Sequence, residues 1–99
     1  MNITELRYLV AIKKWGSVSA AAKQLYAAQP NVSKALKKLE EEYGLRIFER
    51  SSTGMIPTEQ GRRFIEQAAR VLEGEESNDF SRSIFYSQVK SFLNLETYP

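Results

Sequence analysis

The sequence of 99 residues contains no cysteine and no histidine. Without cysteine there is no disulfide, no thiol redox centre and no cysteine-ligated zinc, and without histidine the commonest acid–base group and metal ligand is missing. The chain also lacks a run of about eighteen apolar residues that could span a membrane, and it lacks a secretory signal. These absences argue against an enzyme and against a bound cofactor or metal, and they predict a cytoplasmic protein with no membrane contact.

The composition, with 42% apolar and 26% charged residues, is that of one small globular domain. The net charge of +2 hides an uneven distribution. Residues 1–72 contain twelve Lys or Arg and seven Asp or Glu, whereas residues 73–99 contain two and five. A basic body suits a polyanion such as DNA, provided that the positive charges share one face.

Apolar residues at three- and four-residue spacing predict a first helix from about Thr4, as its N-cap, to Trp15, with Gly16 closing it. Trp15 is expected at the core or its edge. Ser17 is the expected N-cap of a second, alanine-rich helix in which Leu25 anchors the core. Alanine content alone would fit any small bundle, but a connection of only about four residues to the next helix indicates a helix-turn-helix.

The third predicted helix runs from Pro30 to Tyr43, with Gly44 beyond its end. Its outer face is polar and basic at the start, and it ends in Glu40–Glu42, which would repel phosphate and are expected to lie in solvent. The spacing of its apolar residues predicts an inward face made of Val32, Leu36, Leu39 and Tyr43.

The start of this third helix carries the candidate binding residues. Gln29, Ser33 and Lys34 can hydrogen-bond base edges in a DNA major groove. Lys37 and Lys38 follow one turn later and are better placed for phosphate. An isolated lysine run is more often a solvated helix face, but after a helix-turn-helix the same run predicts DNA contact.

After the third helix, a strand over Leu45–Arg50 is predicted to pair with Met55–Pro57 across the turn Ser51–Gly54, which makes a small wing. Thr58 then caps a fourth helix that ends near Glu73. The apolar stripe of this helix exceeds what the core needs, so it is expected to pair with a second copy of the chain. The stripe consists of Phe64, Ile65, Ala68, Ala69 and Leu72.

Residues 74–99 begin with a polar, acidic break and continue as an amphipathic segment. A helix from about Asp79 to Leu93 is the first interpretation of the spacing, and a strand around Ile84 is the alternative. Its apolar face would pack against the body, a second copy or another protein. The weak candidates for metal ligands are Glu75, Glu76 and Asp79.

Together these residues resemble the N-terminal DNA-binding domain of the LysR-type transcriptional regulators, over residues 2 to about 72. The resemblance implies a mainly α winged helix-turn-helix, with a three-helix core, a two-stranded β wing and a linker helix that pairs antiparallel with a partner's. Such a dimer would place two recognition helices about 34 Å apart on a palindromic site. The matching residues are Leu6, Leu9, Gly16, Ser17, Ala21, Ala22, Leu25, Gln29, Pro30, Val32, Ser33, Leu39, Glu40, Gly44, Phe48, Arg50, Thr58, Glu59 and Gly61.

The resemblance implies double-stranded DNA as the partner. It assigns Gln29, Pro30, Ser33 and Lys34 to groove-facing positions and Arg50 to the strand end that leads into the wing. The complete set of expected DNA-binding residues is Gln29, Pro30, Asn31, Ser33, Lys34, Lys37, Lys38, Arg50, Ser51 and Thr53.

The sequence departs from the family pattern at three positions. Ala28 replaces the usual Ser or Thr, so the third helix lacks its best N-cap, an omission that typically costs about 1 kcal/mol. Thr53 stands at an often basic wing position, and Pro57 replaces a usual leucine. Family members also carry a longer C-terminal domain that binds a co-inducer, so no small-molecule effector site is expected in this chain, and its tail could be a remnant of that domain.

We therefore expect three parts: a winged helix-turn-helix DNA-binding domain at 1–58, a linker and dimerisation helix at 59–73, and a tail at 74–99 that is expected to be helical. The predicted function is sequence-specific, dimeric DNA binding without ligand sensing. One alternative is an interaction protein that forms heterodimers with full-length LysR-type regulators through the linker helix. Another is a decayed gene product that folds poorly.

Overall fold

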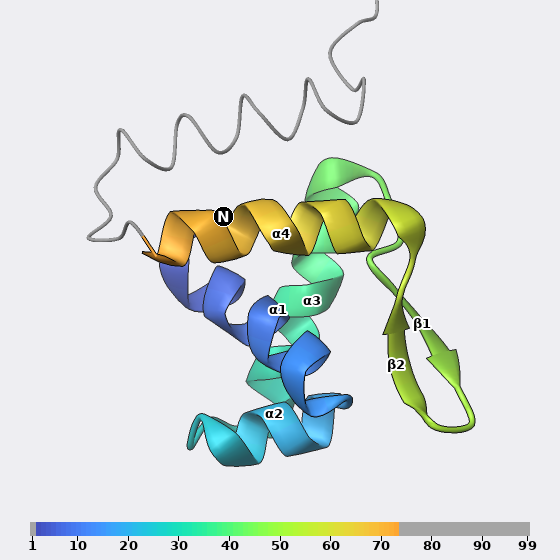
Figure 1. The fold of residues 1–99 in the computed structure, drawn as a ribbon. Helices are drawn as coiled ribbons and strands as arrows, with labels where there is room; N and C mark the ends of the chain where they lie inside the picture. The colour runs from blue at the N-terminus through green and yellow to red at the C-terminus, as the bar shows by residue number, and fades with distance from the viewer. Residues whose placement is uncertain (1, 74–99) are drawn as a thin grey trace, which may run out of the picture.

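The computed structural model describes residues 2–73. The predicted helix at about 79–93, its alternative strand and the candidate metal ligands lie within residues 74–99 and therefore outside the described residues. Within residues 2–73, no helix is both long and apolar enough to cross a membrane. The predicted mainly helical winged helix-turn-helix is confirmed (Figure 1). In chain order, the elements are α1 (Ile3–Trp15), α2 (Val18–Gln24), α3 (Gln29–Tyr43), β1 (Phe48–Ser51), β2 (Gly54–Pro57) and α4 (Glu59–Glu73).

Helix α1 begins with a capping box. Asn2 Oδ1 accepts the N–H of Glu5 at 2.8 Å, and Glu5 Oε1 accepts the N–H of Asn2 at 3.0 Å. The prediction of Thr4 as N-cap is therefore wrong, because Thr4 lies inside the first turn. Gly16 closes the helix as predicted, in a left-handed conformation with a φ of 85°.

Helix α2 begins at the predicted cap, where Ser17 Oγ accepts the N–H of Ala20 at 3.0 Å. Leu25 is not the anchor that the sequence suggested, because α2 ends at Gln24 and Leu25 is 38% exposed. Four residues separate α2 from α3, as predicted. The buried residues of α2 are Val18, Ala21 and Ala22.

Helix α3 begins at Gln29, with Pro30 in its first turn, and Gly44 follows its last residue with a φ of 67°. Leu36 is only partly buried, and Ala35 takes the remaining inward position. The other inward residues are buried as predicted: Val32, Leu39 and Tyr43.

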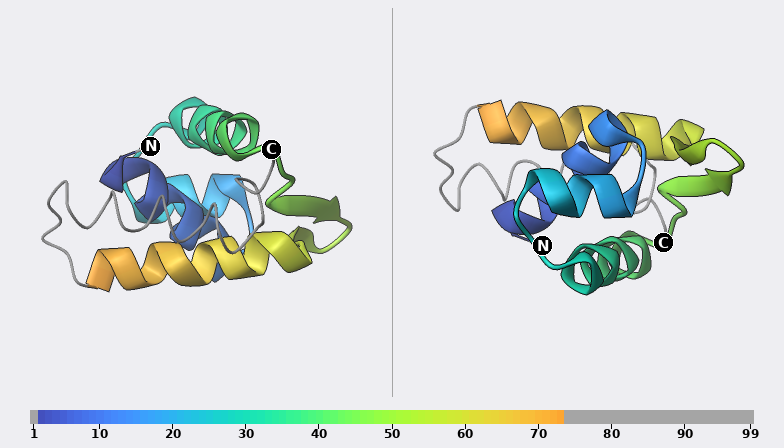
Figure 2. Two further views of the ribbon diagram at one scale, coloured as in Figure 1. Left: turned by 90° about the horizontal axis from the view of Figure 1, so that it is seen from above. Right: turned by 90° about the horizontal axis from the view of Figure 1, so that it is seen from below.

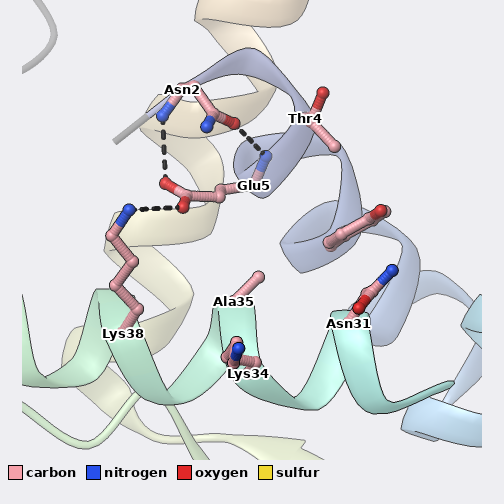
Figure 3. Close-up of a pocket in the computed structure, with 8 residues that line it drawn as sticks. Asn2, Thr4, Glu5, Asn31, Lys34, Ala35 and Lys38 are labelled. Carbon is pink, nitrogen blue, oxygen red and sulfur yellow. Dashed lines mark hydrogen bonds and ion pairs between the residues drawn. The ribbon is translucent and has the colours of Figure 1, made fainter. Parts of the chain in front are cut away.

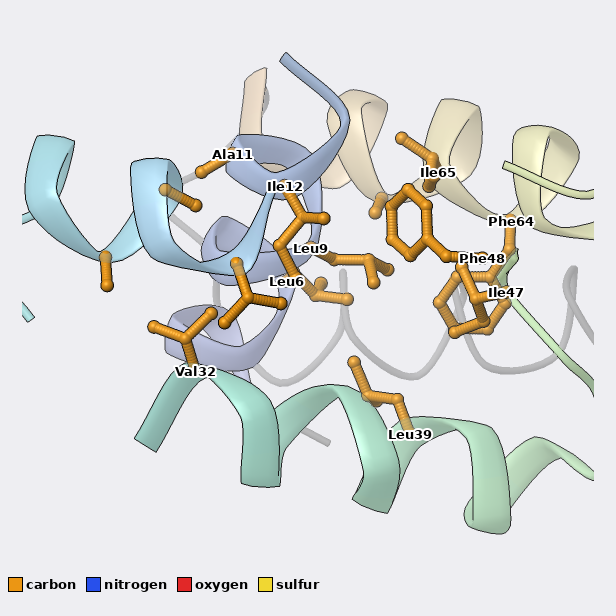
Figure 4. Packing of buried hydrophobic residues seen from close by; sticks show 14 of the residues in the cluster. Leu6, Leu9, Ala11, Ile12, Val32, Leu39, Ile47, Phe48, Phe64 and Ile65 are labelled. Carbon is orange, nitrogen blue, oxygen red and sulfur yellow. The ribbon is translucent and has the colours of Figure 1, made fainter. Parts of the chain in front are cut away.

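Helix α1 forms the centre of the core and lies between α3 on one side and α4 on the other (Figure 2). Its most buried side chains, Leu6, Leu9 and Ile12, are no more than 1% exposed. They meet side chains from α3 and α4 in one continuous cluster (Figure 4). The arrangement leaves the outer side of α3 uncovered by the other described helices.

The wing is an antiparallel pair of β1 and β2 that projects past the helices (Figure 1). Its first strand begins at Phe48, so the predicted start at Leu45 is wrong. The reason is that the preceding residues close the end of α3. Leu45 donates its N–H to the carbonyl oxygen of Glu40 at 3.2 Å, and Ile47 donates its N–H to the Glu40 carboxylate at 2.8 Å.

The second strand of the wing rests on the turn between α1 and α2. Met55 donates its N–H to the carbonyl oxygen of Gly16 at 2.9 Å. A side chain at Gly54 would collide with that same oxygen, so glycine is needed where the two segments meet. Trp15, which precedes Gly16, was expected at the core or its edge, but it is 43% exposed and does not belong to the hydrophobic cluster.

Helix α4 is capped by Thr58 as predicted, since Thr58 Oγ1 accepts the N–H of Gly61 at 2.9 Å. Thr58 also donates its own N–H to the carbonyl oxygen of Ile47 at 3.0 Å. Further along, the ring of Phe64 packs edge-on against the ring of Tyr43, with 4.9 Å between centroids. The first turn of α4 therefore lies directly on the backbone that leads into the wing.

We expect Gly61→Ala to destabilise the fold. In an exposed helix this change is stabilising by roughly 1 kcal/mol. Here the added methyl group would collide with the carbonyl oxygen of Ile47, and the loss in free energy of unfolding should be about 1–3 kcal/mol. Chemical denaturation measures it, with the exposed Gln60→Ala as control. An increase in stability for Gly61→Ala would contradict the close approach.

Candidate nucleic-acid interface

The exposed face of α3 carries most of the residues predicted to contact DNA. Pro30, Ser33, Lys34 and Lys37 are exposed and recur at three- and four-residue spacing, so they form one strip along the outer side of the helix. Gln29 lies at the start of this strip and is also exposed. The structure thus brings five of the predicted residues together on one surface.

The start of α3 has no side-chain cap. Ala28 occupies the N-cap position without a side-chain hydrogen bond, and its carbonyl oxygen accepts the N–H groups of Asn31 and Val32. The first turn of α3 therefore presents the positive end of the helix dipole beside the exposed strip.

A groove of about 290 Å³ separates α3 from the start of α1 (Figure 3). We call it the α1-side groove. Its lining residues are Asn2, Thr4, Glu5 and Tyr8 from α1, and Asn31, Lys34, Ala35 and Lys38 from α3.

Lys38, which the sequence analysis assigned to DNA phosphate, forms an ion pair with another residue of the same chain. Its Nζ donates a hydrogen bond to Glu5 Oε2 at 3.0 Å (Figure 3). The hydrogen bond and the charge of Glu5 raise the pKa of Lys38 above its ordinary value, and Glu42 adds to the shift in the same direction. Sequence spacing could not reveal this pair, because its members lie on two different helices.

A second groove, of about 340 Å³, lies between α3 and the wing, and we call it the wing-side groove. Three exposed cations line it: Lys37 from α3, Arg50 from β1, and Arg46 from the segment before β1. Arg46 was not among the predicted residues. Within residues 2–73 none of the three forms an ion pair, although the exposed Glu41 lines the same groove. The apolar lining of the groove is Leu36, Phe48 and Met55.

Glu40 also lines the wing-side groove, but it has a structural task. Its Oε2 accepts the N–H of Ile47 at 2.8 Å and that of Phe48 at 3.4 Å. The expectation that Glu40–Glu42 simply lie in solvent is therefore wrong for Glu40. The carboxylate satisfies backbone donors where α3 passes into the wing.

The tip of the wing contains the remaining predicted residues, Ser51 and Thr53. Both are exposed, and their hydroxyl groups lie 3.1 Å apart. Ser51 Oγ also donates to the carbonyl oxygen of Gly54 at 2.9 Å and accepts the N–H of Thr53 at 3.1 Å. These hydroxyls build the turn itself, and neither residue lines the wing-side groove.

Most of the apolar stripe on α4 is buried in the core of the same chain. Phe64, Ile65 and Ala68 are no more than 3% exposed and belong to the same hydrophobic cluster as the side chains of α1. Ala69 and Leu72 are only partly buried. A second copy of the chain could therefore reach the last two residues of the predicted dimerisation set but not the first three.

Tyr26 is an exposed aromatic residue that the sequence did not single out. It is 97% exposed and has a φ of 55°, which is uncommon for a residue other than glycine. Tyrosine has no preference for that conformation, so the short turn before α3 was the one feature of the sequence that could indicate it. With Arg7 and Asn31 it lines a further groove beside the start of α3.

A family model described as bacterial regulatory helix-turn-helix protein, lysR family, matches residues 3–62. The chain is 43% identical over 84 residues to the HTH-type transcriptional regulator TfdS of Cupriavidus pinatubonensis (strain JMP 134 / LMG 1197). That match covers 84% of this chain and 28% of TfdS, so the chain spans little more than a quarter of this relative.

Two solved structures, both complexes with DNA, are similar to the chain. The CbnR_DBD–DNA complex matches with a TM-score of 0.72 and 36% identity, covering 85% of this chain and 98% of that chain. The complex of BenM_DBD with benA site 1 DNA matches with a TM-score of 0.70 and 31% identity, covering 89% and 96%. The relatives are transcriptional regulators, which argues against an enzyme and gives no support to the interaction-protein alternative. Within residues 2–73 no group of acidic side chains could hold a metal ion.

We expect Glu40→Ala to destabilise the fold by about 1.5–3 kcal/mol, because the N–H groups of Ile47 and Phe48 lose a charged acceptor. Chemical denaturation measures the effect. The matched control is Glu41→Ala, one residue along the same helix at an exposed position, which should stay within about 0.5 kcal/mol of the unmodified chain. Equal effects of the two substitutions would rule out a special role for Glu40.

Proposed function

The chain belongs to the LysR family of bacterial regulatory helix-turn-helix proteins, and we propose that it binds double-stranded DNA sequence-specifically as a transcriptional regulator. The observation that carries this proposal is the exposed strip on α3, which bears Ser33, Lys34 and Lys37 between two grooves. An α-helix fits the major groove of DNA, which is about 12 Å wide. The two sugar–phosphate backbones that border the groove would then run along the two sides of α3.

Base recognition falls to the first turns of α3. Gln29, Ser33 and Lys34 carry hydrogen-bonding groups on the exposed strip, and Pro30 lets the helix approach the bases closely without an unsatisfied N–H. Asn31 lies beside the strip, in the α1-side groove, where it can reach the border between bases and backbone. The uncapped start of α3 can receive a DNA phosphate, which restores the missing hydrogen-bond partner.

The wing-side groove suits one stretch of DNA backbone. Its rim cations Lys37, Arg46 and Arg50 can neutralise phosphate, and its apolar wall can pack against deoxyribose. Ser51 and Thr53 remain proposed contacts at the wing tip, where a hydroxyl group would donate its hydrogen to a phosphate oxygen in place of its partner within the turn. Arg46 thus joins the predicted set as a residue that supplies affinity rather than sequence choice.

We also propose that two copies of the chain pair through residues 59–73, as the resemblance implies. Ala69 and Leu72 supply the apolar contact, because they remain partly accessible on α4. Beside them runs a charged surface in which Arg62 pairs with Glu66 at 2.9 Å and with Glu59 at 3.5 Å. A homodimer would present two recognition helices to successive major grooves. A heterodimer with a related regulator would use the same surface.

The direct test is selection of bound duplexes from a random DNA pool, with the mass of the protein in the bound complex measured alongside. We expect a half-site motif that recurs as an inverted repeat about one helical turn apart, bound by two protomers. A single half-site bound by one protomer would retain DNA binding but exclude the dimer. Recovery of sequences with no common motif would contradict specific recognition.

Substitutions on the strip should separate base readout from phosphate binding. We expect Ser33→Ala and Lys34→Ala to discriminate less between the selected and random DNA, with a loss of about 1–3 kcal/mol on the selected site. Lys37→Ala should weaken binding to both DNAs and reduce the dependence of log K on log salt by about one unit. Titrations at several salt concentrations measure these effects.

The matched control for Lys37→Ala is Lys13→Ala, which removes the same charge from an exposed position near the end of α1. Its salt dependence should stay close to that of the unmodified chain. If all four substitutions weakened both DNAs equally, the division into readout and backbone residues would be wrong.

A further inference from the structure

Glu5 is a buried carboxylate at the edge of the proposed DNA surface. Its side chain is only 10% exposed, and both of its oxygens accept hydrogen bonds (Figure 3). Oε1 accepts the N–H of Asn2 at 3.0 Å, and Oε2 accepts Nζ of Lys38 at 3.0 Å. One acidic side chain on α1 thus fixes both the start of its own helix and a lysine of the recognition helix.

The pair is held by the burial of its acidic member. A carboxylate that is largely removed from water is unfavourable unless a cation compensates its charge, so Glu5 keeps Lys38 in place. The lysine itself remains accessible, with 58% of its side chain exposed, and the raised pKa of Lys38 shows that Glu5 stabilises its charged form. The exposed ammonium group therefore belongs to a pair with no net charge.

Lys38 differs in this respect from the other cations around α3. Within residues 2–73, no ion pair is formed by the other four: Lys34, Lys37, Arg46 and Arg50. Lys34 lies in the same α1-side groove as Glu5, so the carboxylate also lowers the potential of that groove. The two sides of α3 therefore differ. On the wing side, Glu40 and Glu41 line the groove with the three cations but form no ion pair with them within residues 2–73. In the α1-side groove, one of the two lysines is neutralised by its ion pair with Glu5.

We propose that Glu5 withholds Lys38 from the DNA backbone and so limits the sequence-independent affinity of the recognition helix. This inference rests on the proposed function. A phosphate that approached Lys38 would meet the Glu5 carboxylate 3.0 Å from the ammonium nitrogen, and the attraction and repulsion would largely cancel. Weak backbone binding matters for a regulator, because non-specific sites greatly outnumber its operator in a genome.

The test is the substitution Glu5→Gln in the 99-residue chain, titrated with a duplex of random sequence over a range of salt concentrations. Glutamine preserves the capping box, since its amide oxygen can still accept the N–H of Asn2, and it removes the charge. Lys38 is then free to bind phosphate. We expect tighter binding and a steepening of log K against log salt by about 0.9 for each bound protomer.

The matched control is the double variant Glu5→Gln/Lys38→Met, which has the same net charge as the unmodified chain and a similar side-chain volume. Its affinity and its salt dependence should equal those of the unmodified chain. Thermal unfolding of every variant ensures that each titration is made on folded protein.

Two results would overturn the inference. An unchanged salt dependence for Glu5→Gln would mean that Lys38 does not reach the backbone even when released. A shallower dependence for the double variant than for the unmodified chain would mean that Lys38 already binds phosphate while paired. If the unmodified chain showed no salt-dependent binding to any duplex, the proposed function itself would fail, and the inference with it.

Discussion

The backbone of Ile47 is the point on which the arrangement of the interface depends. Its N–H bonds to the Glu40 carboxylate at 2.8 Å, its carbonyl oxygen accepts the N–H of Thr58 at 3.0 Å, and its side chain is fully buried. Gly61 packs against the same carbonyl group. One residue thus ties the end of α3, the base of the wing and the start of α4 together. The distance between the exposed strip and the wing is fixed by this junction rather than by the flexible arginines themselves.

Two acidic residues near α3 influence how many positive charges the proposed DNA surface presents. Glu40 is occupied by backbone N–H groups, and Glu5 is occupied by Asn2 and Lys38. Both carboxylates already accept hydrogen bonds within the protein, and both lie beside lysines of α3. The number of lysines in the sequence therefore overstates the number of cations available to a ligand, and the difference is set by tertiary contacts.

Much of the fold could be predicted from local chemistry, whereas the contacts between elements could not. Gly16 and Gly44 end helices because they adopt left-handed conformations, and Thr58 begins one because its hydroxyl accepts a backbone N–H. The strip on α3 followed from helical periodicity in the same way. Arg46 and the Glu5–Lys38 pair were missed because neither carries a signal in its own segment. Arg46 gains its place only when the wing folds back beside α3.

Helix α4 shows why an apolar stripe is an ambiguous signal. The same periodicity that suggests a dimer surface is required to close the core, and the most regular part of the stripe, Phe64 to Ala68, is used inside the protomer. Burial of Phe64 against Tyr43 leaves no apolar surface there for a second copy. A dimer built on α4 must therefore rely on the flank that carries Ala69 and Leu72, together with the charged side chains next to it. The DNA itself would add to such an interface, because two protomers bound to one duplex are held close to each other.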